Sequence, residues 1–252
     1  MYTIVFHSAT GNTKHLANKL RDKLRENTKV VNILEVKPES LCADEQLIIM
    51  YPIHGFNASK EIIKYVSNIP QKKFSKINII AVGCNNSWLN DANSIKLRNI
   101  IIEKGYKIGV DRVLAMPLTI GVKFKRQIAV SIIEEAEKSI CNIGEDLIKN
   151  VTDNKVIPIK SKLIYNAGKV EKQAAKLFGL ELYANNDCIS CGVCANQCGA
   201  KNIYMGKNNK PKFKMNCSMC MKCIYDCPVN AIKPRFSKFV LLKEGYSLKD
   251  YL

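Results

Sequence analysis

The first 150 residues alternate between short apolar runs and longer amphipathic stretches. The apolar runs have the length of strands, and their continuous apolarity is typical of strands buried on both faces of a sheet. These predicted strands are Tyr2–Phe6, Val30–Leu34, Leu47–Tyr51, Ile77–Gly83 and Val110–Met116. The spacing of apolar residues predicts helices over His15–Glu26, Lys60–Ile69, Asp91–Lys104 and Gln127–Lys149. This order of elements predicts an α/β fold, a doubly wound parallel sheet with helices on both faces.

The rest of the chain does not continue this alternation. Residues 151–184 carry many charges, with Pro158, Gly168 and a helical pattern over Lys169–Phe178, and we interpret them as a connector. From Asn185 the composition shifts to Cys, Gly and Asn, which indicates a small second domain over residues 185–235. The tail, residues 236–252, mixes aromatic residues with lysines and indicates no function. A sheet domain over residues 1–150 is therefore expected to precede these three parts.

Eight of the eleven cysteines fall in two copies of the spacing C-x2-C-x2-C-x3-C. The copies are Cys188, Cys191, Cys194 and Cys198, then Cys217, Cys220, Cys223 and Cys227. This spacing is typical of bacterial proteins with two [4Fe–4S] clusters, in which the fourth cysteine of each run ligates the cluster of the other run. The spacing therefore predicts one cluster on Cys188, Cys191, Cys194 and Cys227, and a second on Cys198, Cys217, Cys220 and Cys223.

Two alternatives for these cysteines fit less well. Disulfides need an oxidising compartment, and the first residues carry no secretory signal. A zinc site needs four ligands, usually from two separated C-x2-C pairs, which is fewer thiolates than these runs supply. Around the cysteines, Gly192 lets the loop approach a cluster, and Pro228 follows the second run where Gly199 follows the first. That difference is expected to affect loop stiffness more than ligation.

A hydroxyl-rich loop lies between the first predicted strand and the first predicted helix. It consists of Ser8, Ala9, Thr10, Gly11, Asn12 and Thr13. A phosphate bound there would meet backbone N–H groups at a helix N-terminus. The loop lacks both the G-K-[ST] of a triphosphate-binding loop and the G-x-G-x-x-G of a dinucleotide fold. It therefore suits a single terminal phosphomonoester.

The segment Ile4–Thr13 resembles the flavodoxin loop that binds the phosphate of FMN. The whole chain resembles the flavodoxin–ferredoxin fusion proteins of anaerobes, in which a flavodoxin-like domain precedes a bacterial-type ferredoxin domain with two [4Fe–4S] clusters. The resemblance implies a sheet in the order 2-1-3-4-5, followed by a small α+β domain. It also implies FMN at the carboxyl edge of strands one, three and four, which is where doubly wound sheets bind ligands.

Two further loops would frame the flavin ring if this resemblance holds. The first is Tyr51, Pro52, Ile53, His54, Gly55 and Phe56, and the second is Cys84, Asn85, Asn86, Ser87 and Trp88. Tyr51, Phe56 or Trp88 could stack on the ring, or these aromatic residues could simply close the edge of the sheet. His54 could donate to a flavin carbonyl. The second loop has Asn85-Asn86 where the family tends to have two glycines, and asparagine tolerates the left-handed backbone that such a turn needs.

The formal net charge of +17 remains strongly positive even after two clusters and a flavin phosphate are counted. A basic surface attracts acidic partners, so the expected partner is an acidic electron carrier. Plain solubility is the alternative, and nucleic acid or an anionic membrane surface is less favoured because no nucleic-acid motif is present. No apolar run approaches the roughly 20 residues of a membrane span, so we expect a soluble, cytoplasmic protein.

The remaining cysteines and the histidines indicate little chemistry. Cys42, Cys84 and Cys141 are expected to be small core residues. None of the histidines, His7, His15 and His54, is placed for a hydrolytic triad.

Three functions are compatible with the sequence. The first is electron transfer between FMN and two [4Fe–4S] clusters, in either direction. The second is an FMN-dependent reductase of a small organic substrate, with the clusters supplying electrons. The third is a redox-responsive binding module without flavin. No dinucleotide motif supports direct use of NAD(P)H.

Overall fold

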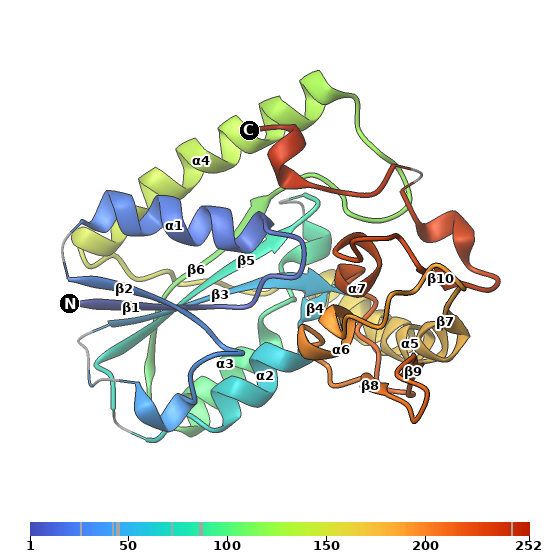
Figure 1. The fold of residues 1–252 in the computed structure, drawn as a ribbon. Coiled ribbons are helices and arrows are strands. Elements are labelled where there is room, and N and C mark those ends of the chain that lie inside the picture. The colour runs from blue at the N-terminus through green and yellow to red at the C-terminus, as the bar shows by residue number, and fades with distance from the viewer. Residues whose placement is uncertain (26, 42, 44–45, 72, 86–87, 243) are drawn as a thin grey trace.

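The computed structural model describes the chain except for residues 26, 42, 44–45, 72, 86–87 and 243. Its main sheet contains the parallel strands β1 (Tyr2–Phe6), β2 (Thr28–Asn32), β3 (Gln46–His54), β5 (Lys76–Gly83) and β6 (Lys107–Ala115). They pair in the order β2-β1-β3-β5-β6 (Figure 1). A short strand, β4 (Asn57–Ala58), pairs antiparallel with the end of β3. Counted along the parallel strands, this is the predicted order 2-1-3-4-5.

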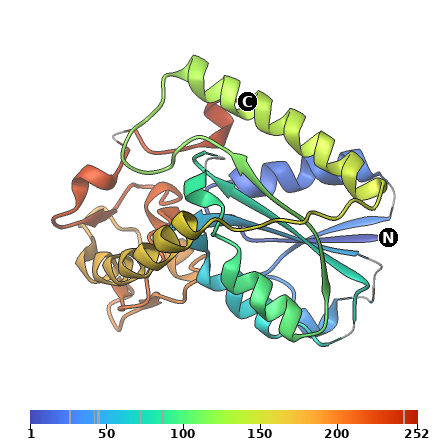
Figure 2. The same ribbon diagram turned by 180° about the vertical axis from the view of Figure 1, so that it is seen from behind.

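Two helices cover each face of the sheet, as Figures 1 and 2 show from opposite sides. Helices α1 (Asn12–Leu24) and α4 (Arg126–Ile148) pack on one face, and α2 (Lys60–Ser67) and α3 (Ile95–Glu103) pack on the other. Successive strand residues point to opposite faces, so Ile4 belongs to the first core and Val5 to the second. Both are fully buried, which explains the continuous apolarity of the strands.

The connector contains a long helix, α5 (Ile159–Glu181), which is longer than the helical pattern predicted from the sequence. Two glycines on one side of α5 allow it to touch both parts of the molecule. A Cβ atom at Gly168 would lie 1.9 Å from the carbonyl oxygen of Gly55, in the loop after β3. A Cβ atom at Gly179 would lie 2.6 Å from Cβ of Cys217, in the second cysteine run. Helix α5 therefore bridges the sheet domain and the cysteine-rich part.

The cysteine-rich part is built from short elements. Strand β7 (Leu182–Ala184) pairs antiparallel with β10 (Ile232–Pro234), and β8 (Ile203–Met205) pairs antiparallel with β9 (Pro211–Phe213). Each cysteine run contributes one short helix, α6 (Val193–Asn196) in the first and α7 (Lys222–Tyr225) in the second. Single 3₁₀ turns lie at η1 (Pro38–Ser40), η2 (Trp88–Asn90), η3 (Lys238–Val240) and η4 (Leu248–Asp250).

The C-terminal tail returns to the sheet domain. Leu242, Tyr246 and Tyr251 are buried in the same core as α1 and α4. The hydroxyl of Tyr246 donates a hydrogen bond of 2.6 Å to Oδ1 of Asn12, at the start of α1. The tail therefore braces the loop between β1 and α1, a role that its sequence did not indicate. Among the described residues, no helix combines the length and the apolarity needed to cross a membrane.

Substituting Gly168→Ala should destabilise the protein, although alanine is normally the better helix former. The new methyl group would push against the Gly55 carbonyl, and overpacking of this kind costs about 1–3 kcal/mol. In a chain of this size the thermal midpoint should fall by about 2–4 °C for each kcal/mol. Asn166→Ala, on the exposed side of the same helix, is the control and should not lower the midpoint. A midpoint for Gly168→Ala at or above that of the control would show that the close contact is absent.

Candidate functional site

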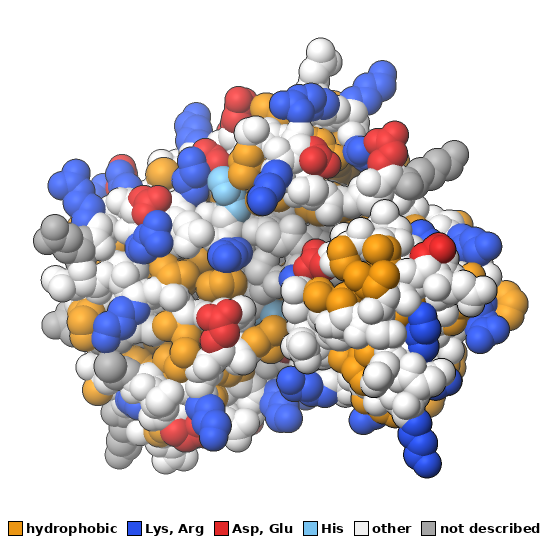
Figure 3. Space-filling model, viewed as in Figure 1, with side chains coloured by type: hydrophobic (Ala, Val, Ile, Leu, Met, Phe, Trp, Pro, Cys, Tyr) orange, Lys and Arg blue, Asp and Glu red, His pale blue; other side chains and the backbone are white. Residues whose placement is uncertain are grey.

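A large cleft lies at the carboxyl edge of the sheet and encloses about 2170 Å³ of space, its open mouth included. Its walls come from the loops after β1, β3, β5 and β6, from α5, and from Cys217–Cys220. A furrow between the sheet domain and the cysteine-rich part is also visible on the face shown in Figure 3. The predicted site residues on the cleft wall are Ser8, Ala9, Thr10, Asn12, Thr13, Pro52, Ile53, His54, Gly55, Phe56 and Cys84.

The loop between β1 and α1 has features of an anion site. The Oγ atom of Ser8 is buried and has no hydrogen-bond partner among the described residues. Gly11 adopts the left-handed region with φ of 99°, which directs the chain into α1. The side chain of Asn12 is already used, because its Nδ2 donates to the Pro117 carbonyl at 3.2 Å while its Oδ1 accepts from Tyr246. Ser8 and the backbone N–H groups are thus the available donors, and Asn12 shapes the loop.

The loop after β3 is held against α5. Gly55 and Phe56 both have left-handed backbone, with φ of 56° and 55°. The Nδ2 atom of Asn57 donates to the carbonyl of Gly55 at 2.6 Å and to that of Tyr165 in α5 at 3.2 Å. The hydrogen bonds of Asn57 therefore hold the loop against α5, and Phe56 lies on the cleft wall.

Of the aromatic residues proposed to stack on a flavin, only Phe56 lines the cleft. Tyr51 is completely buried within β3, and its hydroxyl donates to Oδ1 of Asn93 at 2.6 Å. Trp88 lies outside the cleft wall, where the ammonium of Lys160 sits 4.7 Å from its ring centroid. Tyr165 of α5 is a second aromatic residue on the cleft wall. No pattern in the sequence indicated this role, because it depends on the packing of α5 over the cleft.

The loop after β5 is only partly described, because Asn86 and Ser87 lie outside the described residues. Asn85 is fixed by Asn90, whose Nδ2 donates to the backbone and side-chain oxygens of Asn85 at 2.9 and 3.0 Å. Cys84 is exposed on the cleft wall and Cys141 is partly exposed, so neither is the core residue that the sequence indicated. The prediction for Cys42 also falls outside the described residues.

A buried polar cluster lies between the cleft and the second cysteine run. It contains His7, His54 and Glu61, and Ser218 donates a hydrogen bond to Oε1 of Glu61. Oε2 of Glu61 and Nδ1 of His54 are buried without a hydrogen-bond partner among the described residues. Burial lowers the pKa of His54 to about 4 and also lowers that of His7. Burial would raise the pKa of Glu61, but the two histidines and the Ser218 hydroxyl outweigh it, so that pKa is lowered.

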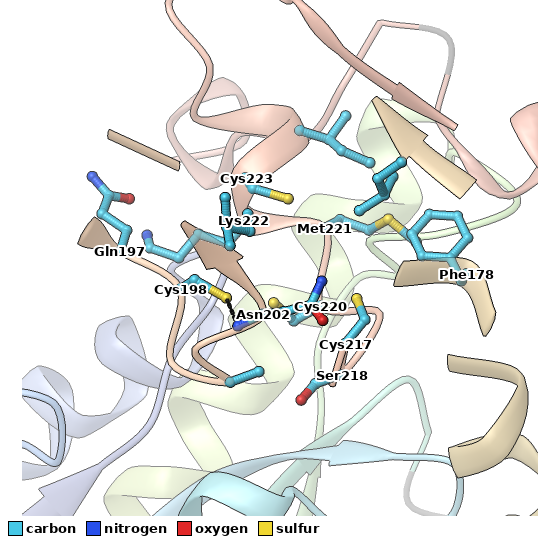
Figure 4. Close-up of a pocket in the computed structure, with 14 residues that line it drawn as sticks. Phe178, Gln197, Cys198, Asn202, Cys217, Ser218, Cys220, Met221, Lys222 and Cys223 are labelled. Atoms are coloured by element: carbon cyan, nitrogen blue, oxygen red, sulfur yellow. Dashed lines mark hydrogen bonds between the residues drawn. The ribbon is translucent and has the colours of Figure 1, made fainter. Parts of the chain in front are cut away.

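The cysteines of the two runs surround two cavities. One cavity, of about 430 Å³ including its mouth, is lined by Cys198, Cys217, Cys220 and Cys223 (Figure 4). The other, of about 340 Å³, is lined by Cys188, Cys191, Cys194 and Cys227. Each cavity thus combines three cysteines of one run with the last cysteine of the other. Within the described residues, no three or more His, Cys, Asp and Glu side chains form a ready-made group for a metal ion.

Both cysteine runs share an unusual backbone. Ser190 and Gly192 in the first run have left-handed backbone, as do Met219 and Met221 at the same places in the second. Such conformations are uncommon for residues other than glycine and concentrate at functional sites. Backbone N–H groups also reach the sulfurs: Met219 donates to Cys217, Asn202 to Cys198 (Figure 4) and Ala231 to Cys227, each at 3.2 Å. Lys201 and Asn230, which precede two of these donors, have left-handed backbone as well.

Burial makes the second-run thiols poor acids. It raises the pKa of Cys220 to about 12 and holds that of Cys223 well above its usual range. A thiolate at these positions needs a compensating cation, and thiol ligands release their protons when a metal binds. The donor set, the cavities and the N–H groups directed at sulfur therefore fit a thiolate-held metal cluster.

The cavity around Cys198, Cys217, Cys220 and Cys223 adjoins the sheet domain. Cys217 and Cys220 line both this cavity and the cleft. Lys222 of the same run donates to the carbonyl of Ala9, in the loop between β1 and α1, at 3.2 Å.

Gly199 also packs against the sheet domain, since a Cβ atom there would lie 3.3 Å from Nε2 of His7. A proline ring at this position would meet the same histidine. This explains why the first run ends in Cys-Gly where the second ends in Cys-Pro.

Residues 3–114 match the family model described as "Flavodoxin domain". These residues carry β1 to β5 and most of β6, so the N-terminal part of the chain is a flavodoxin-like domain. A search of curated proteins finds no match.

Several solved structures are similar to this chain. A flavodoxin from Streptococcus pneumonia TIGR4 is 18% identical, with 60% of this chain and 99% of that chain covered and a TM-score of 0.44. The two-electron reduced flavodoxin of Megasphaera elsdenii is 15% identical, with 56% and 99% covered and a TM-score of 0.39. An NAD(P)H:quinone oxidoreductase from Methanothermobacter marburgensis is 10% identical, with 58% and 96% covered and a TM-score of 0.41.

Substituting Ser218→Ala should destabilise the protein, because Oε1 of buried Glu61 loses its donor while Oε2 already lacks one. An unsatisfied buried group costs about 1–3 kcal/mol. Urea denaturation at neutral pH under anaerobic conditions measures the loss. Ser139→Ala is the matched control, because its hydrogen bond to Glu135 is exposed and 3.4 Å long, and it should change stability by less than about 0.5 kcal/mol. Equal losses of stability in the two variants would show that the buried hydrogen bond to Glu61 contributes no more to stability than the exposed one.

Stability should fall as the pH drops from 6.5 towards 4. The pKa of His54 is about 4 in the folded state and 6.5 as a free group, so in this window the unfolded chain binds more protons. His54→Gln should make the decrease shallower by up to about 1 kcal/mol per pH unit. Urea denaturation of the wild type and of His54→Gln at pH 7.5, 6.5 and 5.5 measures how steeply the free energy of unfolding falls with pH in each protein. An equal decrease of stability with pH in the two proteins would mean that folding does not lower the pKa of His54.

Proposed function

We propose that this chain is an electron-transfer protein that moves electrons between two [4Fe–4S] clusters and FMN. The observation that carries the proposal is the gathering of eight cysteines around two cavities, one of which shares Cys217 and Cys220 with the cleft of a flavodoxin-like domain. A [4Fe–4S] cluster exchanges single electrons and a flavin exchanges one or two, so the combination connects one-electron and two-electron chemistry.

The cysteines would hold the clusters in the crossed arrangement. Cys188, Cys191, Cys194 and Cys227 would ligate one, and Cys198, Cys217, Cys220 and Cys223 the other. The N–H groups of Asn202, Met219 and Ala231 would stabilise the thiolates at Cys198, Cys217 and Cys227. Hydrogen bonds to sulfur are one of the means by which a protein sets a cluster's potential.

The loop between β1 and α1 would hold the phosphate of FMN. Ser8 supports this role, because its buried hydroxyl has no partner among the described residues and would be satisfied by a phosphate oxygen. The N-terminus of α1 adds N–H donors and a favourable dipole. Phe56 and Tyr165, which both line the cleft, are the aromatic residues in place to contact the flavin ring.

The arrangement suggests an order for the electron path. Cys191 is exposed, and its neighbour Ile189 has 62% of its surface exposed, so the cavity around Cys188, Cys191, Cys194 and Cys227 faces outward. The cavity around Cys198, Cys217, Cys220 and Cys223 adjoins the cleft, and α5 forms a further cleft wall. A partner would exchange electrons at the outer position, and the inner position would connect it to the cleft, in either direction.

The expected partner is an acidic redox protein, because the net charge of +17 favours association with acidic surfaces. The proposed location is a reducing cytoplasm, where the cysteines would stay available as ligands.

A second candidate is an FMN-dependent reductase of a small organic acceptor. The volume of the cleft favours it, together with Tyr165, Lys172 and Lys176 of α5, which line the wall. Steady reduction of an organic acceptor by the loaded protein would support this candidate. Turnover with protein carriers alone would support electron transfer.

The crossed ligation predicts a distinctive result for paired cysteine substitutions. The anaerobically reconstituted chain should contain about eight irons and one FMN. Cys191→Ala combined with Cys227→Ala should leave about four irons, because both ligands belong to one cluster. Cys191→Ala combined with Cys198→Ala should leave almost none, because each cluster loses a ligand.

Iron analysis and electron paramagnetic resonance of the reduced variants measure this difference. Cys141→Ala, outside both runs, is the control and should keep about eight irons. The reverse pattern for the two pairs would refute the crossed assignment. A wild-type chain that carries zinc, or fewer than four irons, would refute the clusters altogether.

A further inference from the structure

Helix α5 carries an exposed apolar stripe. Ile159, Leu163, Val170 and Leu177 expose 79%, 67%, 73% and 58% of their surfaces. At 100° per residue these side chains lie along one side of the helix, opposite Gly168 and Gly179. The helix lies on the near side of the molecule in the view of Figure 2.

This stripe is additional to the face by which α5 packs in its own chain. The inner side of the helix buries Ala175 and Phe178 and brings Gly168 and Gly179 against the two domains. An amphipathic helix normally has one apolar stripe, which faces the core, and its other side is polar. A second row of exposed apolar residues on the outside indicates an interaction surface.

The spacing of the stripe indicates a helical partner. Leu163, Val170 and Leu177 recur every seven residues, and Asn166, Gln173 and Leu180 each follow one of them by three. This is the spacing of the a and d positions of a coiled-coil seam, with apolar residues at each a position and at the last d position. Such a seam is narrow because one helix faces another. A helix that lies on a membrane needs a broader apolar face. Asn166 and Gln173 would be polar residues within the seam, and polar residues there fix the register of helix pairs at a cost in stability.

The edges of the stripe indicate the charge of the partner. Lys162 and Lys176 lie along one edge, and exposed Ala167 and Ala174 lie along the other. Alanines allow a second helix to approach closely, while the lysines favour a partner with acidic residues beside its apolar stripe. If a second copy of the chain paired with this helix in antiparallel orientation, the lysine edges of the two helices would meet. Repulsion between the like charges disfavours this pairing.

We propose that the outer face of α5 binds an amphipathic helix of another protein, and that acidic residues of that helix face Lys162 and Lys176. Lys176 also lines the cleft, as does neighbouring Gln173, so the docked helix would run along the cleft mouth. The inference rests on the exposed face of α5 alone and does not depend on the presence of clusters or flavin.

A designed peptide tests this surface in the full-length protein. The probe is a fluorescent 24-residue helix with leucine at its a and d positions and glutamate at e and g, and its comparison peptide has lysine at e and g. Fluorescence anisotropy should show binding of the glutamate peptide at least about tenfold tighter than of the lysine peptide. Leu163→Asp and Val170→Asp should each weaken binding about tenfold or more. Ile102→Asp, at a position 57% exposed on α3, should leave it unchanged.

Other results would overturn the proposal. The glutamate peptide could fail to bind, the two peptides could bind equally well, or Leu163→Asp could leave binding unchanged. Light scattering of the free protein adds another test, because dimerisation abolished by Leu163→Asp would make a second copy the occupant. Sedimentation with vesicles of phosphatidylglycerol and phosphatidylcholine tests a lipid surface, and vesicle binding lost in the same variant would assign the stripe to lipid. Thermal unfolding of each variant, compared with wild type, ensures that only folded proteins are compared.

Discussion

The relation between the cleft and the cysteine cavities depends on close backbone packing by α5. At Gly168 the helix touches the Gly55 carbonyl of the loop after β3, and at Gly179 it touches Cys217. These positions are separated by three helical turns and lie on one side of the helix, so one rigid element fixes both contacts. A side chain at either glycine would separate the parts that it joins. The position of the nearest cysteines relative to the cleft is thus set by a helix that packs against both parts.

The polar contacts between the domains restrict their orientation further. Glu61 meets Ser218, Lys222 reaches the Ala9 carbonyl, and Gly199 packs on His7. These contacts involve residues beside the cysteines and residues beside the cleft, so a rotation of the cysteine-rich part would leave buried Glu61 without its donor. Buried polar groups of this kind make one arrangement much better than its neighbours, because an unpaired group is costly. A fixed arrangement suits the proposed electron transfer, because it would keep the two proposed redox sites close together.

Local patterns in the sequence predicted much of the fold. Continuous apolar runs predicted the parallel strands, and the order of strands and helices predicted the doubly wound topology. The cysteine spacing grouped Cys227 with the first run and Cys198 with the second, and the cavities have the same grouping. These features depend on spacing along the chain, which a sequence displays directly. Cluster binding itself stays a prediction.

The details of the cleft could not be predicted in the same way, because contacts between distant residues decide them. The apolar run predicts a strand that ends at Tyr51, but β3 continues to His54 and keeps Tyr51 in the core. Trp88 is placed by Lys160, and Asn12 is engaged by Tyr246 of the tail. Tyr165 belongs to a segment that looked like a connector. The differences at Trp88, Asn12 and Tyr165 arise where the second half of the chain folds back on the first.

The differences between the cysteine runs match the different surroundings of the two cavities. The runs share their cysteine spacing and left-handed backbone positions, so the backbone conformation around the cysteines is duplicated. Where the first run has exposed Ile189, the second has Ser218, which binds Glu61; where the first has Val193, the second has Lys222, which binds Ala9. The second run is polar at the places where it meets the sheet domain, and the first is apolar at the equivalent places. A repeat that needed only to hold metal would not require this difference. It is explained if contacts with the sheet domain, as well as the proposed metal ligation, determined which residues lie between the cysteines. One cavity then lies beside the cleft, and the other faces outward.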